Sequence, residues 1–186
     1  MTTTTSTLAQ TTGTWAIDAS HTRVGFSAKH AMVATVRGQF NDFTGSLTLD
    51  GAAPEKSVAD VTIATTSIST GSDDRDNHLR SGDFLDVETY PEITFQSTGV
   101  RYEGGDDFVM TGDLTIRGTS RPVELAVELE GLAADPFGNE RIGFTGSTTI
   151  SRKDFGLTWN VALEAGGVLV SDKVKITLDV SAIKQA

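Results

Sequence analysis

The stretch WAIDASHTRVGFSAKH occupies residues 15–30 of a chain of 186 residues, and ISRKDFGLTWN occupies residues 150–160 near the other end. In the first stretch Val24, Phe26 and Ala28 stand at every second position, and His30 continues the row. Such alternation is typical of a β-strand with one face toward a core. With strand patterns near both ends, we expect the first and last strands to meet and close one barrel.

The same alternation runs through most of the chain between these stretches. Each apolar row ends near a Gly, Asp or Pro turn, and the coarse count is eight or nine strands. A barrel of eight strands is just wide enough to be filled by side chains or to hold one slender ligand. The clearest rows are Phe108, Met110, Gly112, Leu114 and Ile116; Val123, Leu125, Val127 and Leu129; Ile142, Phe144, Gly146, Thr148 and Ile150; and Val174, Ile176, Leu178 and Val180.

Local irregularities also indicate curvature. The apolar row that includes Phe40 changes phase before Phe43, which predicts a β-bulge near Asn41 and Asp42 that bends a long strand around a barrel corner. Turn-forming residues at 104–107 and 135–139 predict hairpins.

Residues 69–90 break the alternation, because their apolar residues are spaced as in a helix. We expect one or two short helices within residues 72–88, with Ser72 or Asp73 as the N-cap. A helical insert in an all-β chain is suited to be a lid over the barrel. The alternative is a helix that plugs the barrel end without any gating role.

Composition limits the classes of partner. Fifteen Lys and Arg against 25 Asp and Glu give a net charge of −10, which argues against a nucleic-acid partner and allows at most transient contact with a membrane. The absence of Cys excludes disulfides and thiol chemistry.

The length suits a single domain, and no linker suggests a second one. Residues 1–13 are rich in Thr and poor in apolar residues, so we expect a disordered tail followed by one barrel domain over residues 14–184. The sequence as written shows neither a signal peptide nor a membrane-spanning run, and a cytoplasmic location is expected.

The two opening stretches, together with DNHLRSGDFLDVETYPEITFQST at residues 76–98 and GDLTIRG at residues 112–118, resemble the YceI-like family of polyisoprenoid-binding proteins. The resemblance covers about residues 15–183. It implies an eight-stranded antiparallel, lipocalin-like barrel with an apolar channel for a long-chain isoprenoid or another amphiphile.

Apolar residues on the inward rows are the candidate channel wall. The inward rows by themselves favour a barrel packed solid by its own side chains, whereas the resemblance favours a cavity. The candidates are Val24, Phe26, Phe40, Phe95, Phe108, Met110, Leu114, Phe144 and Trp159.

Several polar residues are candidates for contacts with a ligand head group or with the lid. An imidazole can bind a quinone carbonyl or a metal, but the histidines lack the spacing of a metal site, so a structural role is favoured and no metal is predicted. Ion pairs among Arg152, Asp154, Asp76, Arg80 and Asp83 are the expected fastening between barrel and lid, and Arg37, Arg117 and Arg152 are candidates for a pyrophosphate at the channel mouth. The head-group and lid candidates are His21, His30, Arg80, Arg152 and Asp154.

No motif for a nucleophile, a phosphate loop or a dinucleotide is present, so we expect neither an enzyme nor a cofactor. The function expected is sequestration or transport of a polyprenol, a polyprenyl phosphate, an isoprenoid quinone or a fatty-acid-like lipid. The alternatives are a small metal-dependent enzyme or stress protein that uses the histidines, and a ligand-free barrel that binds a protein partner. A homodimer is compatible with the sequence, although no interface motif indicates one.

Overall fold

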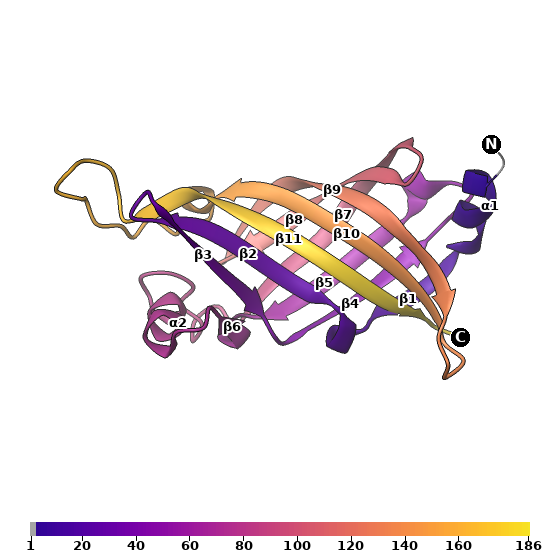
Figure 1. Ribbon diagram of the computed structural model, residues 1–186, viewed down its shortest axis with the longest axis horizontal. Helices are drawn as coiled ribbons and strands as arrows, with labels where there is room; N and C mark the ends of the chain where they lie inside the picture. Colours follow the sequence, from indigo (N-terminus) through magenta and orange to yellow (C-terminus); the bar gives the residue numbers. More distant parts are fainter. Residues whose placement is uncertain (1–2) are drawn as a thin grey trace.

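The computed structural model describes residues 3–186 as one elongated antiparallel β-barrel, with a helix near each end (Figure 1). Alternating apolar and polar residues make each strand two-faced, and closing the sheet buries the apolar face. The strands are β1 Gly13–Ile17, β2 Arg23–His30, β3 Ala34–Phe40, β4 Phe43–Leu49, β5 Val58–Ala64, β6 Ile68–Ser69, β7 Glu92–Gly104, β8 Asp107–Ile116, β9 Thr119–Ala134, β10 Glu140–Ser151 and β11 Val170–Lys184.

The barrel closes through β1, which pairs with both β4 and β11. The ring β1, β4, β5, β7, β8, β9, β10, β11 therefore contains eight antiparallel strands, and this confirms the predicted fold. The long strand β11 also pairs with β2, between Val170 and Asp179 of β11. Beyond β2 the sheet continues, since β2 pairs with β3 and β3 pairs with β6. The first strands of the chain thus meet the last, as the two opening stretches indicate.

A break of two residues at Asn41 and Asp42 separates β3 from β4. The predicted change of direction is present at that place, but as an interruption of the strand and not as a bulge within it. The hairpins at 104–107 and 135–139 are also present, and positive φ angles at Gly104, Gly105 and Gly138 allow their reversals.

The insert contains one α-helix, α2 Asp73–Arg80, followed by hydrogen-bonded turns. Ser72 is its N-cap and accepts a hydrogen bond from the Arg75 N–H, as predicted. Among the described strands β6 pairs only with β3, outside the closed ring, and α2 lies beside β6 (Figure 1). Four 3₁₀ turns complete the described elements: η1 Ala19–His21, η2 Pro54–Lys56, η3 Thr65–Ser67 and η4 Arg152–Phe155.

The prediction of a disordered tail over residues 1–13 differs from the structure. Residues 1–2 lie outside the described residues, but α1 Thr3–Gln10 is helical and β1 begins at Gly13. Leu8 is buried in the core at this end of the barrel, and Trp15 donates a hydrogen bond from Nε1 to the Thr11 carbonyl at 2.8 Å. One apolar side chain and one buried indole thus fasten a stretch whose composition indicates disorder. Neither α1 nor α2 is long and apolar enough to span a bilayer, and no other helix of residues 3–186 is either.

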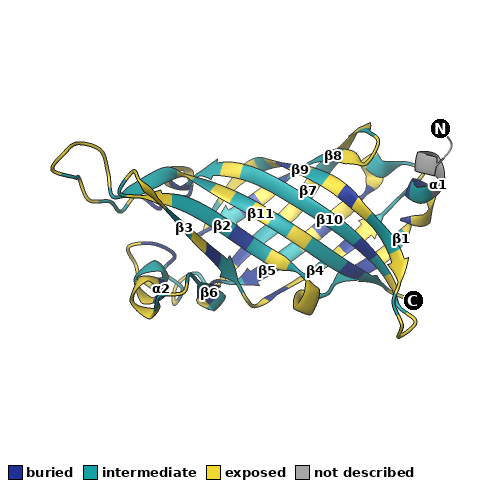
Figure 2. Cartoon of the chain, in the orientation of Figure 1, coloured by how far each residue is buried: buried dark blue, intermediate teal, exposed yellow. Residues whose placement is uncertain are grey.

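Exposed residues alternate with buried or half-buried ones along strands such as β9 and β11 (Figure 2). The buried residues form two clusters, one around Trp15 and Ile142 at the α1 end and one around Phe84 and Phe155 at the α2 end. Glycines inside the strands make room for aromatic rings: a Cβ at Gly38 would collide with Phe26, and one at Gly112 would collide with Phe95. These two glycines therefore serve the packing of the protein's own side chains.

Candidate ligand-binding cavity

A continuous cavity of about 340 Å³ follows the barrel interior and contacts both buried clusters. Its wall is built almost entirely from the apolar faces of the strands. Its volume falls in the range of roughly 300–1,000 Å³ that is typical of small-molecule sites. The arrangement suits a slender apolar molecule that enters the barrel lengthwise.

The structure places eight of the nine predicted channel residues on the cavity wall: Val24, Phe26, Phe40, Phe95, Phe108, Met110, Leu114 and Phe144. Trp159 is the exception. It lies in the segment after η4, outside any strand, and its ring packs on His78 and Phe84 with centroids 4.6 and 5.3 Å away. Strand phase cannot place a residue that is not in a strand, and for this reason the predicted position of Trp159 on the channel wall differs from the structure.

Sequence reasoning missed wall residues that the helical insert contributes. Leu79, Phe84 and Leu85 all line the cavity, and Leu8 lines it at the opposite end. The helical spacing of the apolar residues in the insert was the available signal, because it indicates a face that must be buried against the barrel. The insert is therefore part of the cavity wall.

An aromatic cluster joins the insert to the barrel segment after η4. His78 on α2 packs edge-on against both Phe84 and Trp159, and its Nε2 lies 2.8 Å from Asp83 Oδ2. Edge-to-face contacts of this kind stabilise an aromatic pair beyond the area that it buries. His78 thus joins the helical insert to this segment by ring contacts.

Arg152 at the start of η4 is buried, with 4% of its surface exposed, and it lines the cavity. Its guanidinium donates to four backbone carbonyls: Nε to Ser171 at 2.9 Å, Nη1 to Leu157 and Trp159 at 2.7 and 2.9 Å, and Nη2 to Val170 at 3.2 Å. A guanidinium has five N–H groups, so one Nη2 hydrogen is left over.

The charge of Arg152 has no ion-pair partner among residues 3–186. Burial lowers the pKa of this guanidinium, and the nearby Asp172 opposes that shift. The Asp172 carboxylate itself accepts from Ser151 Oγ and from the Lys153 N–H. The α2 end of a largely apolar cavity therefore contains a cation that carbonyl dipoles and a more distant carboxylate compensate.

The prediction of ion pairs between the helical insert and the barrel is wrong. Arg80 donates to the carbonyls of Thr66 and Ile68, and Asp76 accepts from the Thr70 N–H and hydroxyl. Asp154 is exposed, and its backbone carbonyl accepts a hydrogen bond from Arg121 Nε. Backbone carbonyls at the irregular strand ends need donors, and the arginines satisfy them.

The three arginines considered for a pyrophosphate do not form one site. Arg117 donates to the carbonyls of Gly82 and Phe84, whereas Arg152 is committed to the carbonyls around η4. Arg37 is exposed on β3, between the inward positions 36 and 38. Only Arg152 of the three borders the cavity.

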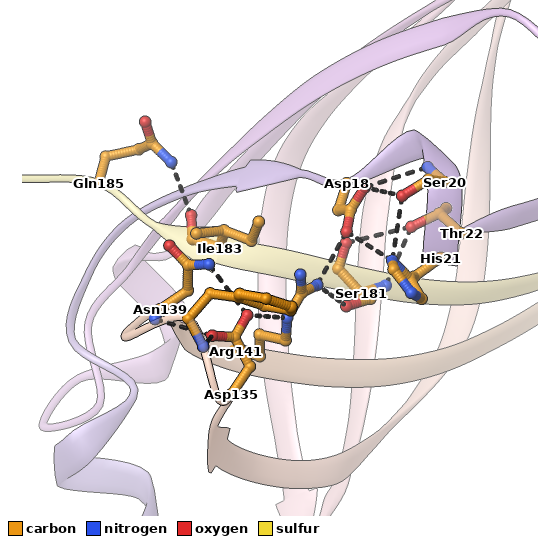
Figure 3. A network of polar contacts seen from close by, with 11 residues as sticks. Asp18, Ser20, His21, Thr22, Asp135, Asn139, Arg141, Ser181, Ile183 and Gln185 are labelled. Carbon is orange, nitrogen blue, oxygen red and sulfur yellow. Dashed lines mark hydrogen bonds and ion pairs between the residues drawn. The ribbon is translucent and has the colours of Figure 1, made fainter.

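His21 lies outside the cavity, in the polar network at the η1 corner shown in Figure 3. Its Nδ1 is 2.8 Å from Asp18 Oδ2 and 3.0 Å from Ser20 Oγ. A Ser–His–Asp relay needs the Ser and the Asp on opposite ring nitrogens, whereas both groups meet Nδ1 here. The geometry supports a structural corner and not a nucleophile.

His30 is exposed at the end of β2, outside the cavity wall. Within residues 3–186 no three His, Asp or Glu side chains are grouped so that they could hold a metal ion. The histidines therefore share no site in this structure.

A family model described as "YceI-like domain" matches residues 15–182. The chain belongs to the YceI-like family. A UPF0312 protein of Pseudomonas aeruginosa is 40% identical over 168 residues, which cover 90% of this chain and 84% of that protein.

Two solved structures of similar fold extend the comparison. Burkholderia cenocepacia BcnA superposes with a TM-score of 0.77 at 26% identity and covers 89% of this chain and 98% of its own. A domain from Saccharophagus degradans, described as polyisoprenoid binding, gives a TM-score of 0.69 at 16% identity and covers 92% and 98%. At that identity the second comparison shows a shared YceI-like fold alone.

Proposed function

We propose that this YceI-like barrel binds a long-chain isoprenoid, or a lipid of similar shape, and sequesters or carries it away from water. The observation that carries the proposal is the continuous apolar cavity along the barrel axis. Each CH₂-sized unit of a chain that leaves water contributes about 0.8 kcal/mol. A long tail can therefore supply the affinity without any special chemistry.

The ligand class is suggested by the family. The Saccharophagus degradans domain of the same fold is described as polyisoprenoid binding, and this makes isoprenoids the first class to test. A polyprenol, a polyprenyl phosphate, an isoprenoid quinone and a fatty-acid-like lipid all satisfy the requirement for an apolar tail.

The two ends of the cavity differ in charge, and the difference supports one orientation of the ligand. Arg152 borders the α2 end, whereas Asp50 borders the α1 end, where its Oδ1 accepts from the N–H groups of Ala52 and Ala53. An electron-rich head group is attracted by the first and repelled by the second. The proposed ligand therefore lies with its head toward Arg152 and its tail toward α1.

The proposed role is binding without catalysis and without a cofactor. The groups on the wall are apolar apart from a few hydroxyls and the two charged ends, and such a lining suits a binding role. A cytoplasmic location and a homodimer stay predictions from the sequence.

The direct test is organic extraction and mass spectrometry of protein purified without detergent, with metal analysis of the same sample. A stoichiometric isoprenoid or related lipid supports the proposal and identifies the ligand. Protein that contains no lipid, and that takes up neither isoprenoids nor fatty acids when these are added, contradicts it.

A further inference from the structure

Exposed large apolar residues gather at one end of the molecule. Four of the seven that the structure describes come from two loops, the β2–β3 turn and the loop of residues 161–169. Both loops project at the same end of the long axis, at the left of Figure 1. We name this group the apolar tip: Met32, Val33, Val161 and Val168, exposed by 63%, 84%, 47% and 39%.

The apolar tip is an ordered structure. Residues 161–169 form a small hairpin, in which the Leu169 N–H donates to the Val161 carbonyl at 2.9 Å and the Leu163 N–H to the Gly167 carbonyl at 3.1 Å. The Ala31 N–H donates to the Leu169 carbonyl at 2.7 Å and so joins the two loops. These hydrogen bonds hold the backbone of both loops in place. The four apolar side chains are therefore exposed to solvent on an ordered backbone.

The base of the tip is tied to the cavity. Asn160 donates from Nδ2 to the Val170 carbonyl and accepts the Val170 N–H at Oδ1, while Arg152 holds the carbonyls of Trp159 and Val170. Val170 lines the cavity, as does Ala28 near the end of β2. The two loops thus extend directly from strands that form the cavity wall.

The residue types in the β2–β3 turn are unusual for its backbone conformation. Ala31 and Met32 have φ angles of 50° and 67°, a region that favours Gly or Asn. This chain places a methyl group and a thioether there and follows them with Val33. Across residues 31–34 and 161–169 the only Asp, Glu, Lys or Arg is Glu164.

A lipid bilayer fits the apolar tip better than a second copy of the chain does. Four side chains on two projecting loops cannot supply the roughly 1,200 Å² that a specific protein interface buries. A small apolar protrusion, by contrast, inserts readily into the boundary between lipid headgroups and acyl chains. With a net charge of −10, the protein would be repelled by an anionic surface, so the matching surface is zwitterionic.

We propose that the apolar tip docks transiently on zwitterionic bilayers and brings the α2 end of the cavity to the membrane for loading or release of lipid. This inference rests on the proposed function for its purpose, although the docking itself can be measured without any cavity ligand. Contact through four side chains is weak and reversible, which suits a carrier that must leave again. Because apolar insertion drives it, docking does not depend on salt.

The first experiment is flotation of the unloaded protein with phosphatidylcholine vesicles. The tip variant is Met32→Asn with Val33→Ser, since Asn tolerates the left-handed backbone at this position. The matched control is Phe137→Ser, which removes an 88% exposed side chain from the β9–β10 turn, away from the tip. We expect the tip variant to lose vesicle binding by at least about tenfold and the control to float as the wild type does.

A second experiment follows transfer of a pyrene-labelled long-chain fatty acid from the protein to the same vesicles. We expect transfer by the wild type to rise with vesicle concentration and to slow in the tip variant, while both proteins bind the labelled lipid equally in the absence of vesicles. If the wild type binds neither this fatty acid nor a labelled isoprenoid, the proposed function fails, and flotation still decides whether the tip docks.

Three results would overturn the docking proposal: equal flotation by wild type and tip variant, an equal loss in the Phe137→Ser control, or a wild-type dimer that the tip substitutions dissociate. The last result would assign the apolar tip to a second copy of the chain.

Discussion

Arg141 Nη1 lies 2.8 Å from Asp18 Oδ2, and this ion pair joins β10 to the η1 corner across 123 residues of sequence. The same guanidinium reaches Asp135 Oδ2 from Nε at 2.7 Å (Figure 3). Asp135 belongs to the β9–β10 turn, so one side chain fastens a hairpin to the place where the first strands of the barrel begin. Both carboxylates are largely shielded from solvent.

These contacts predict how stability depends on pH. The hydrogen bond from Arg141, assisted by Ser20, holds the pKa of Asp18 far below its usual range, and Asn139, followed by Arg141, does the same for the pKa of Asp135. A lowered pKa in the folded state contributes stability above the unfolded value of about 4, and that contribution is lost as the pH falls below it. Arg141→Met removes much of the difference between the pKa of Asp18 in the folded state and its pKa in the unfolded state.

We therefore expect the melting temperature of Arg141→Met to lie below that of the wild type at pH 7, with a gap that narrows as the pH falls below about 4. Thermal melts between pH 2 and 7 measure it. Arg101→Met is the control, because it breaks an exposed pair with Glu103 that contributes little. A gap that stays constant with pH would contradict the role given to Arg141.

Phe144 on the cavity wall predicts the effect of a charge inside the barrel. Phe144→Asp places a carboxylate against an apolar ligand tail, and we expect affinity for isoprenoid to fall by more than about tenfold, or 1.4 kcal/mol. Phe137→Asp, at an exposed turn, should bind as the wild type does. A folded Phe144→Asp protein with unchanged affinity would show that the inward assignment is wrong.

A second variant covers the case in which Phe144→Asp does not fold. Gly146→Leu adds an apolar side chain to the cavity wall, where a Cβ would meet only Leu178 Cδ1 at 3.4 Å and other atoms beyond it. We expect this variant to fold and to favour shorter ligands. Unchanged preference for chain length would place the ligand elsewhere.

Trp15 is fully buried, and its replacement tests the core at the α1 end. Trp15→Ala removes the indole from its cluster and leaves the Thr11 carbonyl without its donor, so we expect the free energy of unfolding to fall by about 3–5 kcal/mol. Denaturant unfolding of ligand-free protein measures this, with exposed Tyr102→Ala as the control, for which a much smaller loss is expected. Similar losses in the two variants would argue against a fastening role for α1 and β1.

The position of Arg152 predicts a preference among head groups. A fatty acid should bind more tightly than the alcohol of the same chain length, by about tenfold, because its carboxylate meets the buried guanidinium. Competition against one fluorescent lipid compares the two, and a shorter acid and alcohol pair controls for the tail. Equal affinities would remove Arg152 from the head-group site.

Much of the cavity wall was predictable because a strand has a period of two. Once Val24 and Phe26 point inward, every second residue follows, and the same holds for Phe108, Met110 and Leu114. The end of β3 before Asn41 was visible as a change of phase, and the start of α2 was visible as a capping Ser72 followed by acidic residues.

The sequence by itself determined which faces are apolar, where the chain turns and that the strands form a two-faced sheet, since these properties depend on neighbours within a few residues. Only the tertiary structure decided that Leu8 fastens a Thr-rich helix, that Trp159 packs on His78 outside the cavity, and that Arg152 is a buried cation on its wall. Those outcomes depend on contacts between segments far apart in the chain. The closing of the ring brings such segments together, and no local pattern encodes which atoms then meet.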